Sequence, residues 1–341
     1  MLYLLPYELL VAIVEYCDRT TRKSLSLVSR RLRDPSQSII FIRVVLPGSQ
    51  SGTFVRKCAS EDREHLSEVT LNDRILSYIQ TLITRSPSVQ FTALHQMQRL
   101  RDIKLHTVRL TTTMLDQLCE VLSTRLYNLE MWRCLYPMRY TVQQETLKIR
   151  KLEYQSEREP PRPETTKVLA AIIERSLSSI ADLTLGSGLG VLAYFGEMPR
   201  LTSLKVFLYL ARKNEDLRNF LIANPQLAKF ELDGPFHDLA LLPRSALPNL
   251  RTIQARADLM QHLVPGRPVE RVEILESSRF NFIADGVRVL SRSAAPIVKL
   301  NLHLFYCRTH LSKILDAVVE TVPHLQRMRL FFHAKVRNVL Y

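Results

Sequence analysis

The stretch LTSLKV at residues 201–206 carries the pattern that decides the fold of this 341-residue chain. An apolar residue is followed by two variable residues, a second apolar residue, one variable residue and a third apolar residue. Because successive side chains of a strand point to opposite faces of a sheet, Leu204 and Val206 would lie on one buried face of a short strand. The same pattern recurs at Leu66/Val69/Leu71, Leu100/Ile103/Leu105, Leu126/Leu129/Met131, Ile180/Leu183/Leu185, Leu227/Phe230/Leu232, Val269/Val272/Ile274, Ile297/Leu300/Leu302, Leu325/Met328/Leu330 and, more weakly, Leu250/Ile253/Ala255.

Segments with helical spacing separate these copies, most of which follow one another after about 20 to 34 residues. Their apolar residues recur three and four positions apart, which is typical of an amphipathic helix. The stripes are Ile75/Leu76/Ile79/Leu82/Ile83, Met114/Leu115/Leu118/Val121/Leu122, Val168/Leu169/Ile172/Ile173 and Leu311/Ile314/Leu315/Val318/Val319/Val322.

A strand, a turn and a helix in each repeat predict an α/β fold of stacked units, and the pattern resembles leucine-rich repeats. That resemblance implies a solenoid with parallel strands on the concave side and helices on the convex side. Only Cys134 cleanly matches the Asn or Cys that the family places after its strand. We therefore expect an irregular solenoid. An α/β sheet without true repeats is the alternative.

The first 45 residues predict a separate helical module. Pro6 suits the first position of a helix, which would end near Tyr16. Asp18, Thr20 and Thr21 are candidate N-caps of a second helix that would end at Pro35. The run IIFIRVVL at residues 39–46 then has strand character.

Three stretches of this module resemble an F-box: LPYELLVAI at 5–13, LSLVSRRL at 25–32 and IFIRV at 40–44, the last typical of fungal members. The segment between the two helices is short, and Arg31 replaces a usually apolar residue, so we expect modest adaptor affinity. The alternative is that residues 1–45 only cap the repeats. By the resemblance, the adaptor-binding residues are Leu5, Pro6, Glu8, Leu9, Leu10, Ile13, Leu25, Val28 and Leu32.

The resemblance implies a substrate-recognition subunit of a Skp–cullin–F-box ubiquitin ligase. The F-box at 1–45 would dock on the Skp-type adaptor of the cullin complex, and a solenoid at 46–341 would bind a target protein. A charged, proline-rich surface loop is expected at 153–167. The alternatives are a repeat scaffold without a ligase role and a basic nucleic-acid-binding protein.

The formal net charge of +14 favours an acidic or phosphorylated partner, or nucleic acid. The basic residues are spread along the chain, however, and no run of Lys or Arg exceeds two residues. This distribution predicts a solvated basic surface, so we do not expect nucleic acid as the partner.

The sequence contains no G-x-S-x-G, H-E-x-x-H or Walker motif. The stretch GSGLG at 186–190 lacks the third glycine of the dinucleotide fingerprint, because residue 191 is Val191. His303, Cys307 and His310 straddle an expected strand–helix junction, which makes a zinc site a poor interpretation. We therefore expect no enzymatic activity, no cofactor and no metal.

The five scattered cysteines form no C-x-x-C pair, which suits a reducing compartment. The apolar run near the N-terminus is interrupted by Pro6 and Glu8, so it predicts neither a signal peptide nor a membrane span. We expect a cytoplasmic or nuclear protein.

Overall fold

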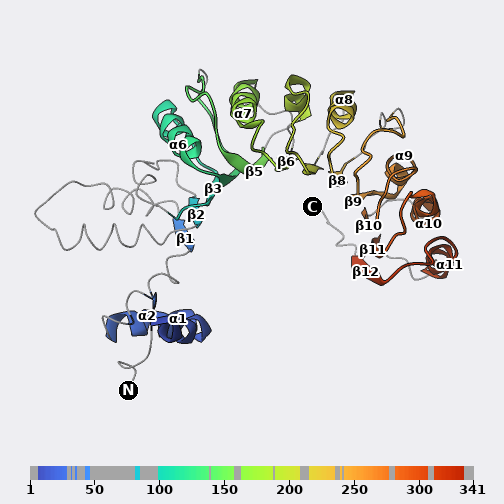
Figure 1. Cartoon of the computed structure of the whole chain (residues 1–341), viewed down its shortest axis with the longest axis horizontal. Helices are drawn as coiled ribbons and strands as arrows, with labels where there is room; N and C mark the ends of the chain where they lie inside the picture. The colour runs from blue at the N-terminus through green and yellow to red at the C-terminus, as the bar shows by residue number, and fades with distance from the viewer. Residues whose placement is uncertain are drawn as a thin grey trace, which may run out of the picture. The chain divides into compact units, whose positions relative to one another are not determined.

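The computed structural model comprises two compact units, Met1–Glu153 and Tyr154–Tyr341. Within each unit the strands run parallel and pair in chain order (Figure 1). The structure describes residues 7–28, 32, 35–36, 43–46, 81–84, 99–137, 140–156, 163–186, 189–207, 215–234, 239, 242–275, 281–305 and 311–333.

Unit 1 begins with two helices and continues into parallel strands. The pairings β1–β2, β2–β3 and β3–β4 are all parallel, for example with Ile103 of β3 opposite Leu129 of β4. The elements are α1 (Tyr7–Tyr16), α2 (Arg19–Val28), β1 (Arg43–Leu46), β2 (Thr81–Thr84), β3 (Asp102–His106), α6 (Thr112–Thr124), β4 (Tyr127–Trp132) and β5 (Ile149–Gln155), whose last two residues belong to unit 2.

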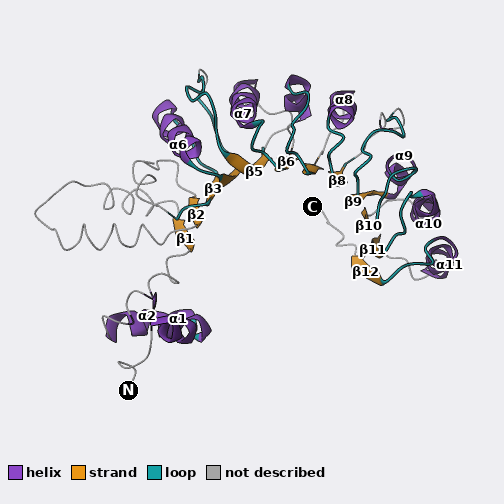
Figure 2. Cartoon of the chain, in the orientation of Figure 1, coloured by secondary structure: helices purple, strands orange, loops and turns teal. Residues whose placement is uncertain are grey.

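Unit 2 repeats a strand followed by a helix or 3₁₀ turn, and its strands line the inner side of an arc with the helices outside (Figure 2). Each strand from β6 to β12 pairs in parallel with the next. The elements are α7 (Pro163–Ser176), β6 (Asp182–Gly186), η4 (Leu189–Tyr194), β7 (Ser203–Phe207), α8 (Glu215–Ala223), β8 (Lys229–Asp233), β9 (Thr252–Arg256), η6 (Ala257–Leu259), α9 (Met260–Leu263), β10 (Arg271–Leu275), α10 (Asn281–Val289), η7 (Leu290–Arg292), β11 (Lys299–Phe305), α11 (Leu311–Thr321) and β12 (Arg327–His333).

The core lies between the strands and the helices of each repeat. In β7, Leu204 and Val206 are fully buried and alternate with the half-buried Ser203, Lys205 and Phe207, as the pattern at 201–206 predicts. Helix α11 buries Ile314, Ala317 and Val318 on the face that it turns to the strands. The predicted α/β fold, with N-terminal helices followed by parallel strands, is therefore confirmed.

Three local predictions need correction or completion. Leu82 and Ile83, predicted on a helix, lie in β2. Strand β5 was not anticipated, although Ile149, Leu152 and Tyr154 follow the repeat pattern and are buried. Because β5 extends to Gln155 and α7 begins at Pro163, the two elements occupy both ends of the expected loop at 153–167. The copy at 66–71 lies outside the described residues.

Individual polar side chains satisfy the turns where a regular asparagine ladder is missing. The buried thiol of Cys134 donates to the carbonyl of Leu105, 3.3 Å away in the preceding repeat. Burial raises the pKa of this thiol to about 12, so it stays protonated and can donate. In unit 2, Ser293 Oγ lies 3.0 Å from Arg267 O and 2.9 Å from Val269 O, although its single proton can be donated to only one of them at a time.

Arg267 is the largest fully buried side chain of the described chain, at 1% exposure. Its guanidinium donates to three backbone carbonyls: Nε to Ala246 (2.7 Å), Nη1 to His262 (2.9 Å) and Nη2 to Pro243 (2.8 Å). The preceding Gly266 has φ of 75°, which glycine adopts without steric cost. Arg267 thus joins the turn before β10 to the turn that precedes β9.

Asn224 performs a similar role between α8 and the preceding repeat. Its Oδ1 accepts the N–H of Met198 (2.8 Å), and its Nδ2 donates to the carbonyls of Gly196 (3.1 Å) and Phe220 (2.8 Å). The side chain is fully buried. These bonds fix one turn against its neighbour, because a buried backbone group without a partner costs free energy.

Candidate protein-binding surfaces

Helices α1 and α2 form a small unit with its own core. Leu10, Val14 and Leu32 are at most 5% exposed and pack together, with Leu25 partly buried against them. Arg22 of α2 donates from Nε to Val14 O (2.8 Å) and from Nη2 to Glu15 O (2.6 Å), which satisfies carbonyls at the end of α1.

Asp18 is the N-cap of α2, one of the three residues that the sequence offered for this position. Its Oδ1 accepts the backbone N–H of Thr21 at 2.8 Å. This hydrogen bond lowers the pKa of the Asp18 carboxyl. A negatively charged N-cap stabilises a helix, because the N-terminal end of the helix dipole is positive.

Beside the face of α1 that packs into this core, an apolar stripe is open to solvent. Leu9, Ile13 and Tyr16 lie at i, i+4 and i+7, so they share one helix face. They are 51%, 40% and 94% exposed. We call these three residues the docking stripe, because apolar side chains that share an uncovered helix face are typical of a surface that binds another protein.

The residues expected to bind the adaptor thus divide into two groups. Leu10, Leu25 and Leu32 contribute to the internal core, whereas Leu9 and Ile13 lie in the docking stripe. Leu5 and Pro6 lie outside the described residues, and for Glu8 and Val28 only the helix position is described. Tyr16 was not anticipated, although its i+7 spacing from Leu9 is visible in the sequence. The adaptor-binding role of all these residues stays a prediction.

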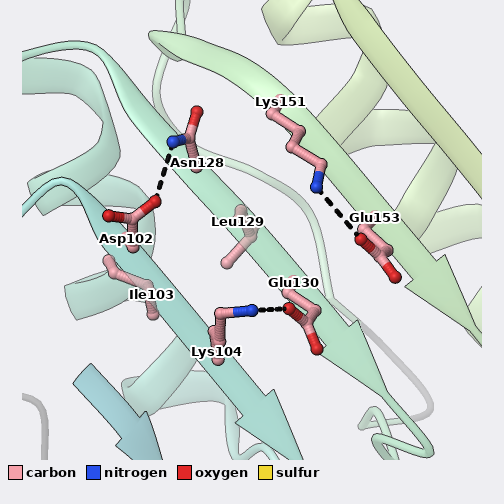
Figure 3. Close-up of a pocket in the computed structure, with 8 residues that line it drawn as sticks. All are labelled: Asp102, Ile103, Lys104, Asn128, Leu129, Glu130, Lys151 and Glu153. Carbon is pink, nitrogen blue, oxygen red and sulfur yellow. Dashed lines mark hydrogen bonds and ion pairs between the residues drawn. The ribbon is translucent and has the colours of Figure 1, made fainter. Parts of the chain in front are cut away.

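The second candidate surface is the strand face, formed by the residues that alternate with the core. In unit 1 it includes a shallow pocket lined by β3, β4 and β5 (Figure 3). Asn128 Nδ2 donates to Asp102 Oδ1 at 2.7 Å, and Lys104 pairs with Glu130. Lys151 and Glu153 form a further ion pair at 3.3 Å.

Trp132 lies at the end of β4 on this face and is 37% exposed. The His106 ring meets it edge-on at 5.3 Å between centroids, while Nε2 of His106 is 2.7 Å from Glu130 Oε1. The Arg133 guanidinium lies 5.3 Å from the indole centroid, within cation–π range. An amphipathic aromatic held by polar neighbours is a typical anchor for a protein partner.

In unit 2 two glutamates of the strand face contact basic or polar side chains of their own or a neighbouring strand. Glu231 of β8 meets Lys205 at 2.6 Å and Lys229 at 2.5 Å. Glu273 of β10 accepts from Asn301 Nδ2 at 3.0 Å and lies 3.0 Å from His303 Nε2. Both glutamates hold neighbouring strands in register through side-chain contacts.

Acid should weaken unit 2 through Glu231. Burial opposes its ionisation, but hydrogen bonds from Lys205 and Lys229 outweigh burial and lower its pKa below 4.5. A carboxylate that is more acidic in the folded than in the unfolded chain contributes stability above about pH 4.5, which is lost as the pH falls further. We expect Glu231→Gln to flatten the dependence of urea stability on pH between about pH 5 and 3. Glu215→Gln, at a side chain 69% exposed, is the control and should leave the slope unchanged.

Across the described ranges, no group of three or more His, Cys, Asp or Glu side chains is placed to hold a metal ion. His303 contacts Glu273, while Cys307 and His310 lie outside those ranges. Of the helices that the structure describes, none has the length and apolar character needed to cross a membrane.

Comparison with known protein families identifies the helix pair α1 and α2. The family model of the F-box domain matches residues 2–34, which include α1 and α2. An F-box domain is therefore combined in this chain with parallel strand-and-helix repeats of the kind expected for leucine-rich repeats.

Two further comparisons concern solved structures and curated proteins. The crystal structure of the leucine-rich repeat-containing protein LegL7 from Legionella pneumophila is similar at a TM-score of 0.40 and 11% identity, over 85% of this chain and 90% of that chain. The search of curated proteins gives no match.

Proposed function

We propose that this chain is the substrate-recognition subunit of a Skp–cullin–F-box ubiquitin ligase. The observation that carries the proposal is the F-box match at residues 2–34 together with the uncovered docking stripe on α1. The F-box would bind a Skp-type adaptor, and the adaptor would connect it to the cullin complex. The strand face of the repeats would hold the target protein.

The energetics of the docking stripe support the adaptor half of this proposal. Fully burying one leucine side chain stabilises a complex by about 1.5–3 kcal/mol. Leu9 is half-exposed without a complex, whereas its neighbour Leu10 already lies in the internal core. Leu9 can therefore gain burial on binding without any rearrangement of the helix pair.

The strand face supports the target half of the proposal. It offers an exposed tryptophan and many charged side chains on rigid strands, and alternate positions can change without disturbing the core. The chain itself would not be catalytic, since other subunits would transfer ubiquitin. We place such a receptor in the cytoplasm or nucleus. Its assignment to the fungal type of F-box protein rests on the sequence at 40–44.

Replacing Leu9 with aspartate should abolish adaptor binding. The change removes the apolar anchor and introduces a charge into the interface, which should cost about 2 kcal/mol or more, or roughly thirtyfold in affinity. Titration of a purified Skp-type adaptor into the full chain, followed by calorimetry, measures this loss.

The control is Thr20→Asp, which adds the same charge at an exposed position in the first turn of α2, where an acidic residue is tolerated. It should bind the adaptor as the wild type does. Circular dichroism should show that Leu9→Asp keeps its helices, because Leu9 lies outside the internal core. If well-folded wild-type chain shows no adaptor binding at micromolar concentration, the ligase proposal fails and a capped repeat scaffold replaces it.

A further inference from the structure

Strand β12 is the last strand of the described sheet and has one unpaired edge. Its seven residues pair in parallel with β11, from Lys299 opposite Arg327 to Phe305 opposite His333. Along the other edge no strand pairs with β12 among the described residues. Such an edge carries a row of backbone N–H and C=O groups that can pair with another extended chain.

Four cations of the strand face lie on β12 and on the two strands before it. Arg271, Lys299 and Arg327 lie directly opposite one another on β10, β11 and β12, and Arg329 follows two residues later on β12. Neighbouring strands are about 4.8 Å apart, and like charges directly opposite each other are destabilising. Within the described residues none of these four side chains has a carboxylate partner, unlike Lys205 and Lys229, which share Glu231. We call these four residues the cation row.

Apolar side chains accompany the cation row. Phe331 is 37% exposed on the strand face and stacks on His303, with ring centroids 4.6 Å apart. On the other face of β12, Phe332 is 61% exposed and Leu330 is partly exposed, whereas Leu302 of β11 is fully buried. Both faces of β12 therefore leave apolar surface that an added strand could cover.

We propose that an acidic, extended segment of the target protein adds to the edge of β12 as a further strand. Its carboxylates would lie beside Arg327 and Arg329, and the apolar residues between them would cover Leu330 and Phe332. Main-chain hydrogen bonds would supply affinity, and the alternating side chains would supply specificity. This proposal rests on one part of the proposed function, in which the strand face binds a target protein. It adds that the bound segment of the target is acidic and extended.

Charge excludes the other occupants of this edge. A second copy pairing through its own β12 would bring another Arg327 and another Arg329 to this edge and so add to its positive charge. Residues 334–341 of this chain carry Lys335 and Arg337 and no acidic residue. Only a partner of opposite charge relieves the repulsion within the cation row.

The test uses a fluorescein-labelled peptide in which glutamate and valine alternate over about seven residues, the length of β12. Fluorescence anisotropy with the full chain should show saturable binding that weakens as salt is added, since salt screens exposed charges. The same peptide with lysine in place of glutamate should not bind. If neither peptide binds up to about millimolar concentration, a range that still detects weak association, the inference is wrong.

Charge reversal locates the site. Arg327→Glu combined with Arg329→Glu should weaken binding of the acidic peptide at least about tenfold, because two opposite-charge pairs become like-charge pairs. The matched control combines Arg292→Glu and Lys313→Glu, at exposed positions on η7 and α11. These two changes lower the net charge by the same amount. Equal weakening by both double variants would overturn the assignment to β12.

Backbone N-methylation distinguishes strand addition from plain charge attraction. In an added strand, alternate N–H groups face β12 and the others face away. Methylating one alternate set of peptide nitrogens should abolish binding, and methylating the other set should leave most of it. Tolerance of both sets would refute strand addition. The β12 double variant should bind the Skp-type adaptor as the wild type does. A wrong strand-addition proposal would therefore leave adaptor binding intact, whereas a wrong F-box assignment would show no adaptor binding at all.

Discussion

Arg267→Ala is expected to lower the free energy of unfolding of unit 2 by about 3–5 kcal/mol, the range for truncating a large, well-packed buried side chain to alanine. The substitution removes three charge-assisted hydrogen bonds to the carbonyls of Pro243, Ala246 and His262. It also leaves a cavity where the largest fully buried side chain had been.

The charge of Arg267 is part of this effect. Burial lowers the pKa of its guanidinium to about 10, so the group is still protonated at neutral pH. The carbonyl dipoles that surround it stabilise that charge. Arg267→Lys keeps the charge but cannot reach three divergent carbonyls at once, so we expect it to lose a large part of the same stability.

Urea unfolding followed by circular dichroism measures both variants. The control is Arg200→Ala, which removes an exposed arginine in the turn before β7 and should change stability by less than about 0.5 kcal/mol. An Arg267→Ala midpoint equal to that of the control would show that the three carbonyls find other donors.

Asn224→Ala should lower the free energy of unfolding of unit 2 by about 2–4 kcal/mol. It leaves the N–H of Met198 and the carbonyl of Gly196 without the partners that Asn224 provides. Asn224→Asp should be at least as costly, because a carboxylate oxygen would then face the carbonyls of Gly196 and Phe220. A buried charge without a donor is strongly unfavourable.

Hydrogen exchange is a sensitive measurement for the Asn224 variants. We expect faster exchange at Met198, whose N–H bonds to the side chain, and in the adjoining turns. Asn219→Ala is the control, since Asn219 is exposed on the same helix. Unchanged protection of the Met198 amide in Asn224→Ala would contradict the role assigned to this side chain.

Most strands of this fold could be predicted from the sequence, because the repeat pattern spans only six residues. Within each copy, the spacing of the apolar residues shows which side chains of the strand are buried. Leu82 and Ile83 were misplaced because their spacing from Ile75 and Ile79 also fits a helix. Strand β5 was missed because Lys151 and Glu153 interrupt its apolar residues and lead into a proline-rich stretch. The alternation of a strand is hard to recognise when its exposed residues are charged.

The candidate surfaces were less predictable. Leu9 and Leu10 belong to one apolar face in the sequence, and only the packing of α2 against α1 decides that Leu10 is internal and Leu9 exposed. Arg267 resembles any surface arginine, because the carbonyls that it binds are up to 24 residues away in the sequence. The cation row depends on the register of three strands, which no local pattern contains.

Trp132 gives this chain a built-in spectroscopic reporter. It is the single tryptophan of the sequence and lies in unit 1, partly exposed at the end of β4. Indole emission therefore follows the melting of unit 1 alone, whereas far-ultraviolet circular dichroism sums over both units. Coincident curves would mean that the two units lose structure in one cooperative step, and separated curves would give each unit its own stability without any label or truncation.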